Sequence, residues 1–186
     1  MLRIIGGSAK KHRLIVPRGN GIRPTAARVR EALFNILAPV VPGSRFLDVF
    51  AGTGSVGIEA LSRGAREACF IESNPRALSV LRANVAQAVP GAKARVIAGD
   101  ALRALRRLAD EGTPFDIIFM DPPYGKGYER RALECVAAGH LLASGGVCVI
   151  EVSKGTLPAE RVDSLVLFRC ERYGDTVLTF YRYEEA

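Results

Sequence analysis

The stretch Asp48-Val49-Phe50-Ala51-Gly52-Thr53-Gly54-Ser55-Val56-Gly57 joins an apolar run at 45–50 to a second apolar run at 55–63. The first run is typical of a buried strand, and the second of a helix. The glycines between them let the backbone turn tightly and approach a ligand, and the N-terminus of the helix offers unpaired N–H groups. A GxGxxG motif in this position predicts an α/β fold that binds a ligand at the loop.

Strand-like and helix-like runs continue to alternate after this loop. Strands are predicted at 68–72, 94–98, 115–120 and 147–152, and a helix is predicted in each interval between them, the last near 128–139. Asn74 is a suitable N-cap for the first of these helices, and Pro75 suits its first position. Such alternation favours a mostly parallel sheet with helices on both faces.

The last two strand-like runs, at 166–168 and 177–183, are separated only by a turn around Gly174. This connection is too short for a helical crossover, so the two runs predict an antiparallel hairpin. The expected fold class is therefore α/β: a Rossmann-like, doubly wound sheet of seven strands, mostly parallel, with an antiparallel C-terminal hairpin.

An N-terminal arm over residues 1–24 is expected to precede a single globular domain over 25–186. Short strand-like runs at 3–5 and 14–16 predict a small β-ribbon in the arm. Beyond Pro24, Val29, Leu33 and Leu37 recur at helical spacing and predict a helix that stops before Pro39.

The positive charge of the chain is concentrated at its N-terminus. The 186 residues carry 26 Lys and Arg against 19 Asp and Glu, a net charge of +7. Residues 31–186 hold all the acids and 18 of the cations, whereas residues 1–30 hold eight cations and no acid: Arg3, Lys10, Lys11, Arg13, Arg18, Arg23, Arg28 and Arg30. Such a run is either a solvated basic face or a surface for a polyanion. The strand-like residues between the charges favour contact with RNA.

The four cysteines are widely spaced, form no CxxC pair and have no histidine cluster nearby. This pattern predicts buried, reduced thiols and no metal site. The sequence also contains no signal-peptide core and no apolar run of transmembrane length, so a cytoplasmic location is expected.

Acidic residues follow the next two predicted strands. Glu72 ends the second strand, where its carboxylate can accept hydrogen bonds from ribose hydroxyls. Asp100 ends the third strand and either accepts from an adenine amino group or caps the following helix. The pattern predicts an adenosine-containing cofactor without separating a dinucleotide from S-adenosylmethionine. The candidate cofactor-binding residues are Asp48, Phe50, Gly52, Thr53, Gly54, Glu72, Ser73, Asp100 and Ala101.

A second motif, Asp121-Pro122-Pro123-Tyr124, directly follows the apolar strand at 115–120. Two prolines fix φ at both positions and remove two N–H donors, which leaves a stiff loop with outward carbonyls. A carboxylate, a fixed carbonyl and an aromatic ring suit an exocyclic amine on a planar base: Asp121 and the Pro122 carbonyl accept its hydrogens, and Tyr124 stacks on the ring. These four residues are the candidate catalytic residues.

The glycine loop and the DPPY tetrad resemble the amino-methylating branch of the class I S-adenosylmethionine-dependent methyltransferases. Segments 3–7, 23–25, 28–35, 59–65 and 173–176 resemble the RsmD family, which methylates a guanine N2 amino group in 16S rRNA. Two positions depart from that family's pattern: Lys11 stands where Gly is frequent, and Ala26-Ala27 stands where a polar pair with Asp is usual.

The resemblance implies that the strands before the two motifs lie side by side, that S-adenosylmethionine is the methyl donor, that no metal is needed and that 16S rRNA is the partner, within the 30S subunit or an assembly intermediate. A monomer is expected. The candidate RNA-binding residues are Arg3, Lys10, Lys11, His12, Arg13, Arg23, Thr25, Arg28 and Arg30.

The tetrad alone also fits a methyltransferase acting on adenine N6 or on the N5 amide of a protein glutamine. The glycine loop and Glu72 alone fit an NAD-dependent oxidoreductase, but that class has no use for the tetrad. A catalytically silent RNA-binding protein would not need an intact tetrad either.

Overall fold

The computed structural model describes residues 2–17, 26–123 and 125–184. Its helices are α1 (Ala27–Leu37), α2 (Ser55–Ser62), α3 (Pro75–Ala88), α4 (Ala101–Asp110) and α5 (Tyr128–Ala138). Its strands are β1 (Arg45–Val49), β2 (Glu67–Glu72), β3 (Ala94–Ala98), β4 (Phe115–Met120), β5 (Leu142–Ser153), β6 (Arg161–Val162), β7 (Leu165–Tyr173) and β8 (Thr176–Tyr183).

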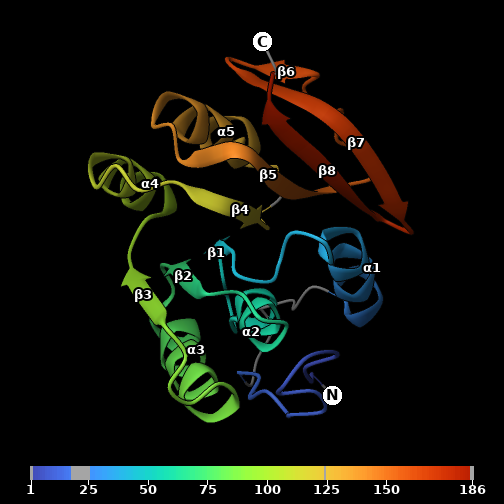
Figure 1. Ribbon diagram of the computed structural model, residues 1–186. Coiled ribbons are helices and arrows are strands. Elements are labelled where there is room, and N and C mark those ends of the chain that lie inside the picture. Colours follow the sequence, from blue (N-terminus) through green and yellow to red (C-terminus); the bar gives the residue numbers. More distant parts are fainter. Residues whose placement is uncertain (1, 18–25, 124, 185–186) are drawn as a thin grey trace.

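One sheet contains all of these strands in the order β3-β2-β1-β4-β5-β8-β7-β6 (Figure 1). The neighbours from β3 to β5 are parallel, and those from β5 to β6 are antiparallel. The predicted α/β class and the C-terminal hairpin are confirmed. The predicted number of strands is wrong, because β6 adds an eighth strand that spans only two residues and gives no periodic signal.

Strand β5 also begins five residues earlier than the sequence indicates. Leu142 pairs with Phe115, and the register with β4 then shifts before Ile117 pairs with Val147. The irregular segment contains Gly145 at φ 72° and Gly146, where an added Cβ would lie 2.9 Å from the Asp116 carbonyl oxygen. Gly145 therefore allows the irregular turn of the backbone, and Gly146 allows β5 to approach β4 closely.

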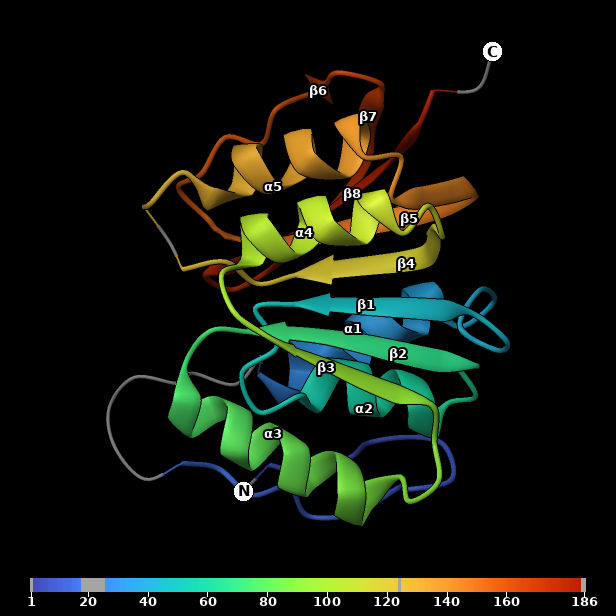
Figure 2. The same ribbon diagram turned by 90° about the vertical axis from the view of Figure 1, so that its left-hand side faces the viewer.

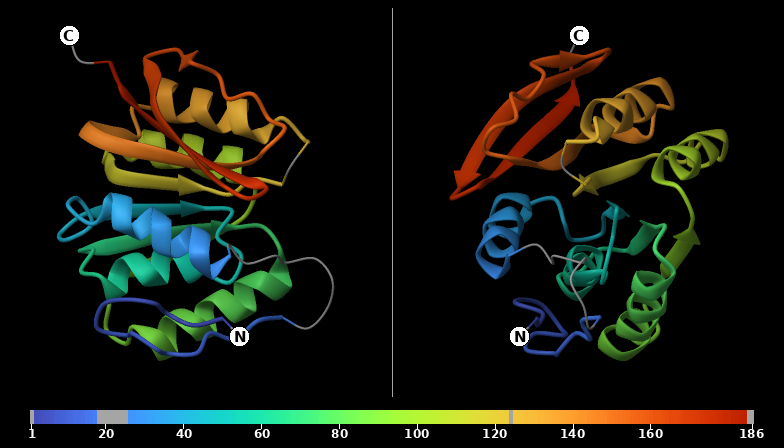
Figure 3. Two further views of the ribbon diagram at one scale, coloured as in Figure 1. Left: turned by 90° about the vertical axis from the view of Figure 1, so that its right-hand side faces the viewer. Right: turned by 180° about the vertical axis from the view of Figure 1, so that it is seen from behind.

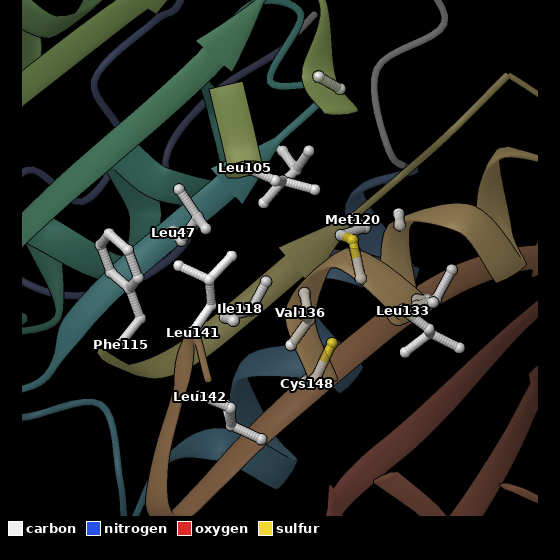
Figure 4. Close-up of a cluster of buried hydrophobic side chains, with 14 of the residues drawn as sticks. Leu47, Leu105, Phe115, Ile118, Met120, Leu133, Val136, Leu141, Leu142 and Cys148 are labelled. Atoms are coloured by element: carbon white, nitrogen blue, oxygen red, sulfur yellow. The ribbon is translucent and has the colours of Figure 1, made fainter. Parts of the chain in front are cut away.

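Helices cover both faces of the sheet (Figures 2 and 3). Helices α4 and α5 pack on one face around Leu105, Ile118 and Val136, the core shown in Figure 4. Helices α1, α2 and α3 pack on the other face around Phe34, Phe46 and other fully buried side chains. Each fully buried Leu or Phe stabilises the fold by about 1.5–3 kcal/mol relative to an exposed one.

The described part of the N-terminal arm, residues 2–17, packs beside α2 and α3 (Figure 3). It folds back on itself through one antiparallel bridge between Arg3 and Arg13, and Ile4 exchanges backbone hydrogen bonds with Lys11 and His12. The predicted ribbon is therefore present as a minimal pairing. Ile4 is buried in the core and anchors the arm.

All four cysteines are free thiols. Cys69 and Cys148 are buried, and burial raises the pKa of the Cys69 thiol to about 11. Cys135 is half-buried, and the expectation of burial is wrong for Cys170, which lies in β7 among three consecutive exposed residues. Within the described ranges, no helix is long and apolar enough to cross a membrane.

Candidate active site

The glycine loop between β1 and α2 depends on backbone conformations that side chains disfavour. Gly52 has φ 56°, and Gly54, the N-cap of α2, has φ 78°. A Cβ on Gly57 would lie 2.3 Å from the Phe70 ring, so this glycine lets α2 pack directly on β2. Phe50 adopts φ 63° without being glycine, a strained conformation of the kind found at functional sites. The three glycines thus have the turning, approaching and packing roles expected of the motif.

Asp48 holds this loop from beneath. Its side chain is 2% exposed, and its Oδ2 accepts a hydrogen bond of 2.8 Å from the Gly57 N–H. Burial raises the pKa of Asp48 to about 8, while the bond from Gly57 opposes the rise. Asp48 therefore positions the loop that would contact the cofactor, and its own carboxylate is directed at the protein.

Glu72 connects the ends of β1 and β2. Its Oε2 accepts from the Gly52 N–H at 2.7 Å, and its Oε1 accepts from the Ser73 and Asn74 N–H groups at 2.8 and 2.7 Å. The residue is half-buried and lies beside the glycine loop, to which it is bonded through Gly52. This position suits an acceptor for ribose hydroxyls.

Asp100 lies at the end of β3, and both alternatives raised by the sequence remain compatible with its position. Its Oδ1 accepts from the Arg103 N–H at 3.0 Å, which confirms it as the N-cap of α4. The residue is exposed, whereas the next residue, Ala101, is buried.

The other two candidate cofactor-binding residues also differ in burial: Ser73 is exposed, and Thr53 is buried. Asn74 is confirmed as the N-cap of α3, accepting from Arg76 and Ala77.

The tetrad begins where β4 ends. Val49 and Met120 are paired in the parallel strands β1 and β4, so the glycine loop and the tetrad leave the sheet side by side, at its carboxyl edge. The Asp121 N–H also points to the Val49 carbonyl at 3.4 Å. Asp121 is half-buried, Pro122 is buried and Pro123 is exposed. Tyr124 lies outside the described residues.

Tyr128, which the sequence analysis did not select, contacts the glycine loop. It is the first residue of α5, and its ring meets that of Phe50 edge to face, with centroids 5.5 Å apart. Arg131 lies 5.8 Å above the same tyrosine ring. No pattern marks Tyr128, because its role depends on the fold bringing α5 to the glycine loop.

The candidate RNA-binding residues that the structure describes are exposed or half-buried, with one exception. Arg3, Lys10, Lys11, Arg13 and Arg28 are exposed, and His12 is half-buried. The first three line a groove of about 640 Å³ between the arm and α1. Arg23 and Thr25 lie outside the described residues.

Arg30 is the exception, and its prediction as an RNA-contacting residue is wrong for this conformation. Its side chain is 0% exposed, and its Nη2 donates to the Arg3 carbonyl at 2.5 Å. Burial lowers the pKa of the guanidinium, and the carboxylate of Glu59, 3.6 Å from Nε, opposes that effect. Arg30 therefore acts inside the protein, where it links α1, α2 and the arm.

Glu59 of α2 is the buried centre of this junction. Its carboxylate accepts from the N–H groups of Ile5 and Gly6 at 2.8 and 2.7 Å, and from Arg63 Nε at 2.8 Å. Glu59 is thus one of the buried side chains that fasten the arm to the core.

Asn84 of α3 makes a second fastening that reaches the glycine loop. Its Oδ1 accepts from the Ile15 N–H at 2.7 Å, and its Nδ2 donates to the carbonyls of Ile15 and Thr53, each at 3.0 Å. The residue is 1% exposed. One amide therefore holds both the arm and the candidate cofactor loop.

The backbone conformation at Lys11 explains why glycine is frequent at this position in the RsmD family. It lies at the tip of the arm with φ 72°, a left-handed conformation that glycine adopts without strain. A glycine at this position is therefore the natural choice for the turn, and this chain accepts strain there together with an additional positive charge.

The comparisons with known proteins agree with this geometry. The family model described as Conserved hypothetical protein 95 matches residues 2–182. Ribosomal RNA small subunit methyltransferase D of Escherichia coli (strain K12) is 39% identical over 178 residues, covering 90% of this chain and 88% of that protein.

Among solved structures, yhhF from Escherichia coli has a TM-score of 0.85 and 37% identity, covering 98% of this chain and 97% of that chain. The structure of SMU.776 complexed with SAH has a TM-score of 0.64 at 13% identity, covering 83% of this chain and 48% of that chain, and shows the fold alone. Because the family model spans nearly the whole sequence, the chain belongs to the family described as Conserved hypothetical protein 95, the RsmD family.

Proposed function

We propose that this protein transfers a methyl group from S-adenosylmethionine to the exocyclic N2 amino group of a guanine in small-subunit ribosomal RNA. The observation that carries the proposal is the pairing of β1 with β4, which brings the glycine loop and Asp121-Pro122-Pro123 to one edge of the sheet. A cofactor loop and an amine-binding loop must lie together for a methyl group to pass between them. Family membership and the Escherichia coli relative support an rRNA substrate.

The residues around the glycine loop fit the adenosine part of the cofactor. Gly52 and Gly54 let the backbone approach it, Glu72 accepts from the ribose hydroxyls, and Asp100 accepts from the adenine amine. S-adenosylmethionine, when bound, supplies an activated methyl group on a positively charged sulfur. Asp48 keeps the loop in shape through Gly57.

The tetrad positions the amine. The lone pair of the guanine N2 amine is delocalised into the ring, so it must be localised and aimed at the methyl group. Asp121 and the Pro122 carbonyl accept the two amine hydrogens, and the Asp121 carboxylate stabilises the positive charge that develops on nitrogen. The proton then leaves to Asp121 or to water. Tyr124 is proposed to stack on the base after it has been splayed from the RNA.

The arm, residues 1–24 in our division of the chain, is proposed to hold the RNA outside the site. Its exposed cations, Arg3, Lys10, Lys11 and Arg13, suit phosphate contacts. The body at residues 25–186 then carries the cofactor and the chemistry. We propose that the enzyme acts in the cytoplasm, as a monomer, on 16S rRNA in the 30S subunit or in an assembly intermediate.

Methyl incorporation with identification of the modified product tests this proposal. The substrates are naked 16S rRNA, 30S subunits, DNA and protein extract, each incubated with labelled S-adenosylmethionine. N2-methylguanosine in the RNA is the expected product. N6-methyladenine or methylated glutamine as the main product would contradict the guanine assignment and identify one of the related amino-methyltransferase activities.

Asp121→Ala tests the role of the tetrad. We expect methyl transfer to fall roughly 100-fold, because a positioned polar group is lost, while S-adenosylhomocysteine still stabilises the protein against heat. Asp110→Ala is the matched control, since Asp110 is an exposed carboxylate at the end of α4. Turnover near that of the wild type in Asp121→Ala would remove Asp121 from the mechanism.

A further inference from the structure

Strand β5 extends beyond the strand that pairs with it on one side. Its parallel partner β4 ends at Met120, which pairs with Ile150, and the chain then continues into Asp121. On the other side, β5 continues to pair with β8, with Glu151 opposite Leu178. Glu151 is therefore the first residue of β5 that has the tetrad loop beside it in place of a strand.

The side chains of Glu151 and Asp121 belong to the same face of the sheet. In β5, Ile150 packs in the core beneath α4 and α5, so alternation turns Glu151 toward the opposite face. In β4, Met120 packs in that same core, and alternation directs Asp121 in the same way as Glu151. Neighbouring strands lie about 4.8 Å apart, so these two residues leave adjacent strands side by side.

Packing alone does not account for a glutamate at this position. Glu151 is only 5% exposed, and placing a carboxylate at a buried position costs several kcal/mol more than placing an apolar side chain there. Val149, two residues earlier on the same face, shows that an apolar side chain satisfies the core there. At the edge where such sheets bind ligands, Glu151 gives Asp121 a neighbouring carboxylate, so two acceptors lie side by side.

We propose that Glu151 accepts a hydrogen bond from the N1–H of the guanine whose N2 amine lies against Asp121, and that it thereby selects guanine over adenine. This inference rests on the proposed function. The N1–H and N2–H groups are adjacent donors on one edge of guanine, which matches two neighbouring acceptors. Adenine has an unprotonated N1 acceptor, whose lone pair would face the carboxylate. Glu151 is a specificity-determining residue in this arrangement, and Asp121 remains the residue at the reacting amine.

A base analogue that differs from guanine at N1 tests the inference. 2-Aminopurine keeps the N2 amine but has neither the N1–H nor the O6 of guanine, so the contribution of Glu151 is measured by comparing the preference of the wild type with that of a Glu151 variant. Once the target guanine is mapped, small-subunit particles are reconstituted with rRNA that carries either guanine or 2-aminopurine at that position. We expect the wild type to favour guanine by about 100-fold or more in kcat/KM, because a site built for a donor rejects an analogue that lacks it.

Glu151→Gln is expected to narrow this preference to within about 10-fold, because an amide can accept from N1–H or donate to an unprotonated N1. Glu160→Gln, an exposed glutamate beyond the end of β5, is the matched control and keeps the wild-type preference. Stabilisation by S-adenosylhomocysteine verifies that each variant is folded.

An unchanged preference in folded Glu151→Gln, whatever its activity, would overturn the inference and leave Glu151 a structural residue. If that variant does not fold, equal activity of the wild type on guanine and 2-aminopurine would overturn it. If the wild type does not methylate guanine N2, the proposed function is overturned instead. The methyl-incorporation experiment gives that result before any Glu151 variant is made.

Discussion

The N-terminal arm and the C-terminal hairpin are both additions to the parallel sheet, but they are held in different ways. The hairpin pairs through its backbone, with β8 hydrogen-bonded to β5 from Cys148 to Ser153 and to β7 along its length. The arm has one isolated bridge of its own and depends on side chains that reach out from the core, above all Glu59 and Asn84. The attachment of the arm therefore rests mainly on a few side chains, whereas that of the hairpin is distributed along its backbone.

The two regions also use arginine differently. In the hairpin, Arg182 lies 5.0 Å above the Phe168 ring, and Arg169 contacts Phe180 and pairs with Glu171. In the arm, Lys10 and Arg13 are exposed and make no ion pair with any residue that the structure describes. The hairpin arginines thus contact aromatic rings and a carboxylate of the protein, whereas Lys10 and Arg13 are exposed to solvent. A phosphate-binding arm needs cations in the second situation.

The largest expected effect comes from removing the buried carboxylate under the arm. Glu59→Ala should lower the free energy of unfolding by about 3–5 kcal/mol, because Arg30 is left buried without its counter-charge. Glu171→Ala, which breaks an exposed pair in the hairpin, should change it by less than about 0.5 kcal/mol. Chemical denaturation measures both, and equal losses would abolish the distinction between the two regions.

Removal of positive charge should weaken RNA binding when the charge lies in the arm, and should leave RNA binding unchanged when the charge lies in the hairpin. Replacing Lys10, Lys11 and Arg13 by Ala should weaken RNA binding and reduce the slope of log K against log salt by about 2, since each phosphate contact contributes about 0.7–0.9. The same change at Arg169, Arg172 and Arg182 should leave the slope unchanged. A filter-binding or fluorescence titration over a range of salt concentrations checks this, and a flattened slope in the hairpin variant would contradict the division of roles.

Asn84→Ala should act on the arm and the glycine loop together. The change removes hydrogen bonds to Ile15 and Thr53, so we expect a loss of about 1–3 kcal/mol of stability and weaker binding of S-adenosylhomocysteine. Asn35→Ala on the exposed side of α1 is the control. Calorimetric titration measures the affinity, and undiminished affinity in Asn84→Ala would show that the loop keeps its shape without this amide.

The smallest effect concerns the turn of the arm. Lys11→Gly should raise stability by about 0.5–1 kcal/mol, because it relieves the left-handed backbone at that position. Lys10→Gly removes the same charge at a neighbouring position without a positive φ, and it should give no gain. Thermal unfolding of the two variants separates strain from charge, and a gain in both would assign the effect to charge.

The sequence predicts the architecture well because its elements have strong local signals. The apolar run at 115–120, the Asn74 cap and the GxGxxG loop each specify their own structure, and strict alternation then specifies the sheet. Strand β6 and the first residues of β5 were missed, since a two-residue strand and a glycine-containing strand lack periodicity.

The candidate site could be predicted as far as its loops, and less well in its supporting residues. Arg30 was interpreted as an RNA contact from the charge run, although it falls on the same helix face as Phe34 and Leu37, which is a signal of burial. Asn84 likewise lies on the buried face of α3 with Leu81 and Ala88. Charge alone does not separate an exposed cation from a buried one, whereas charge considered together with helical periodicity would have done so.

The fastening of the arm by Asn84 also constrains the order in which the chain can fold. Ile15 and Asn84 are 69 residues apart, and Glu59 is more than 50 residues from the backbone groups that it binds. During synthesis the arm leaves the ribosome first, but its docking surface is complete only when α3 has emerged. We therefore expect the basic arm to remain undocked, near ribosomal RNA, early in synthesis. It can reach its final position only after β1, β2 and α3 have been made.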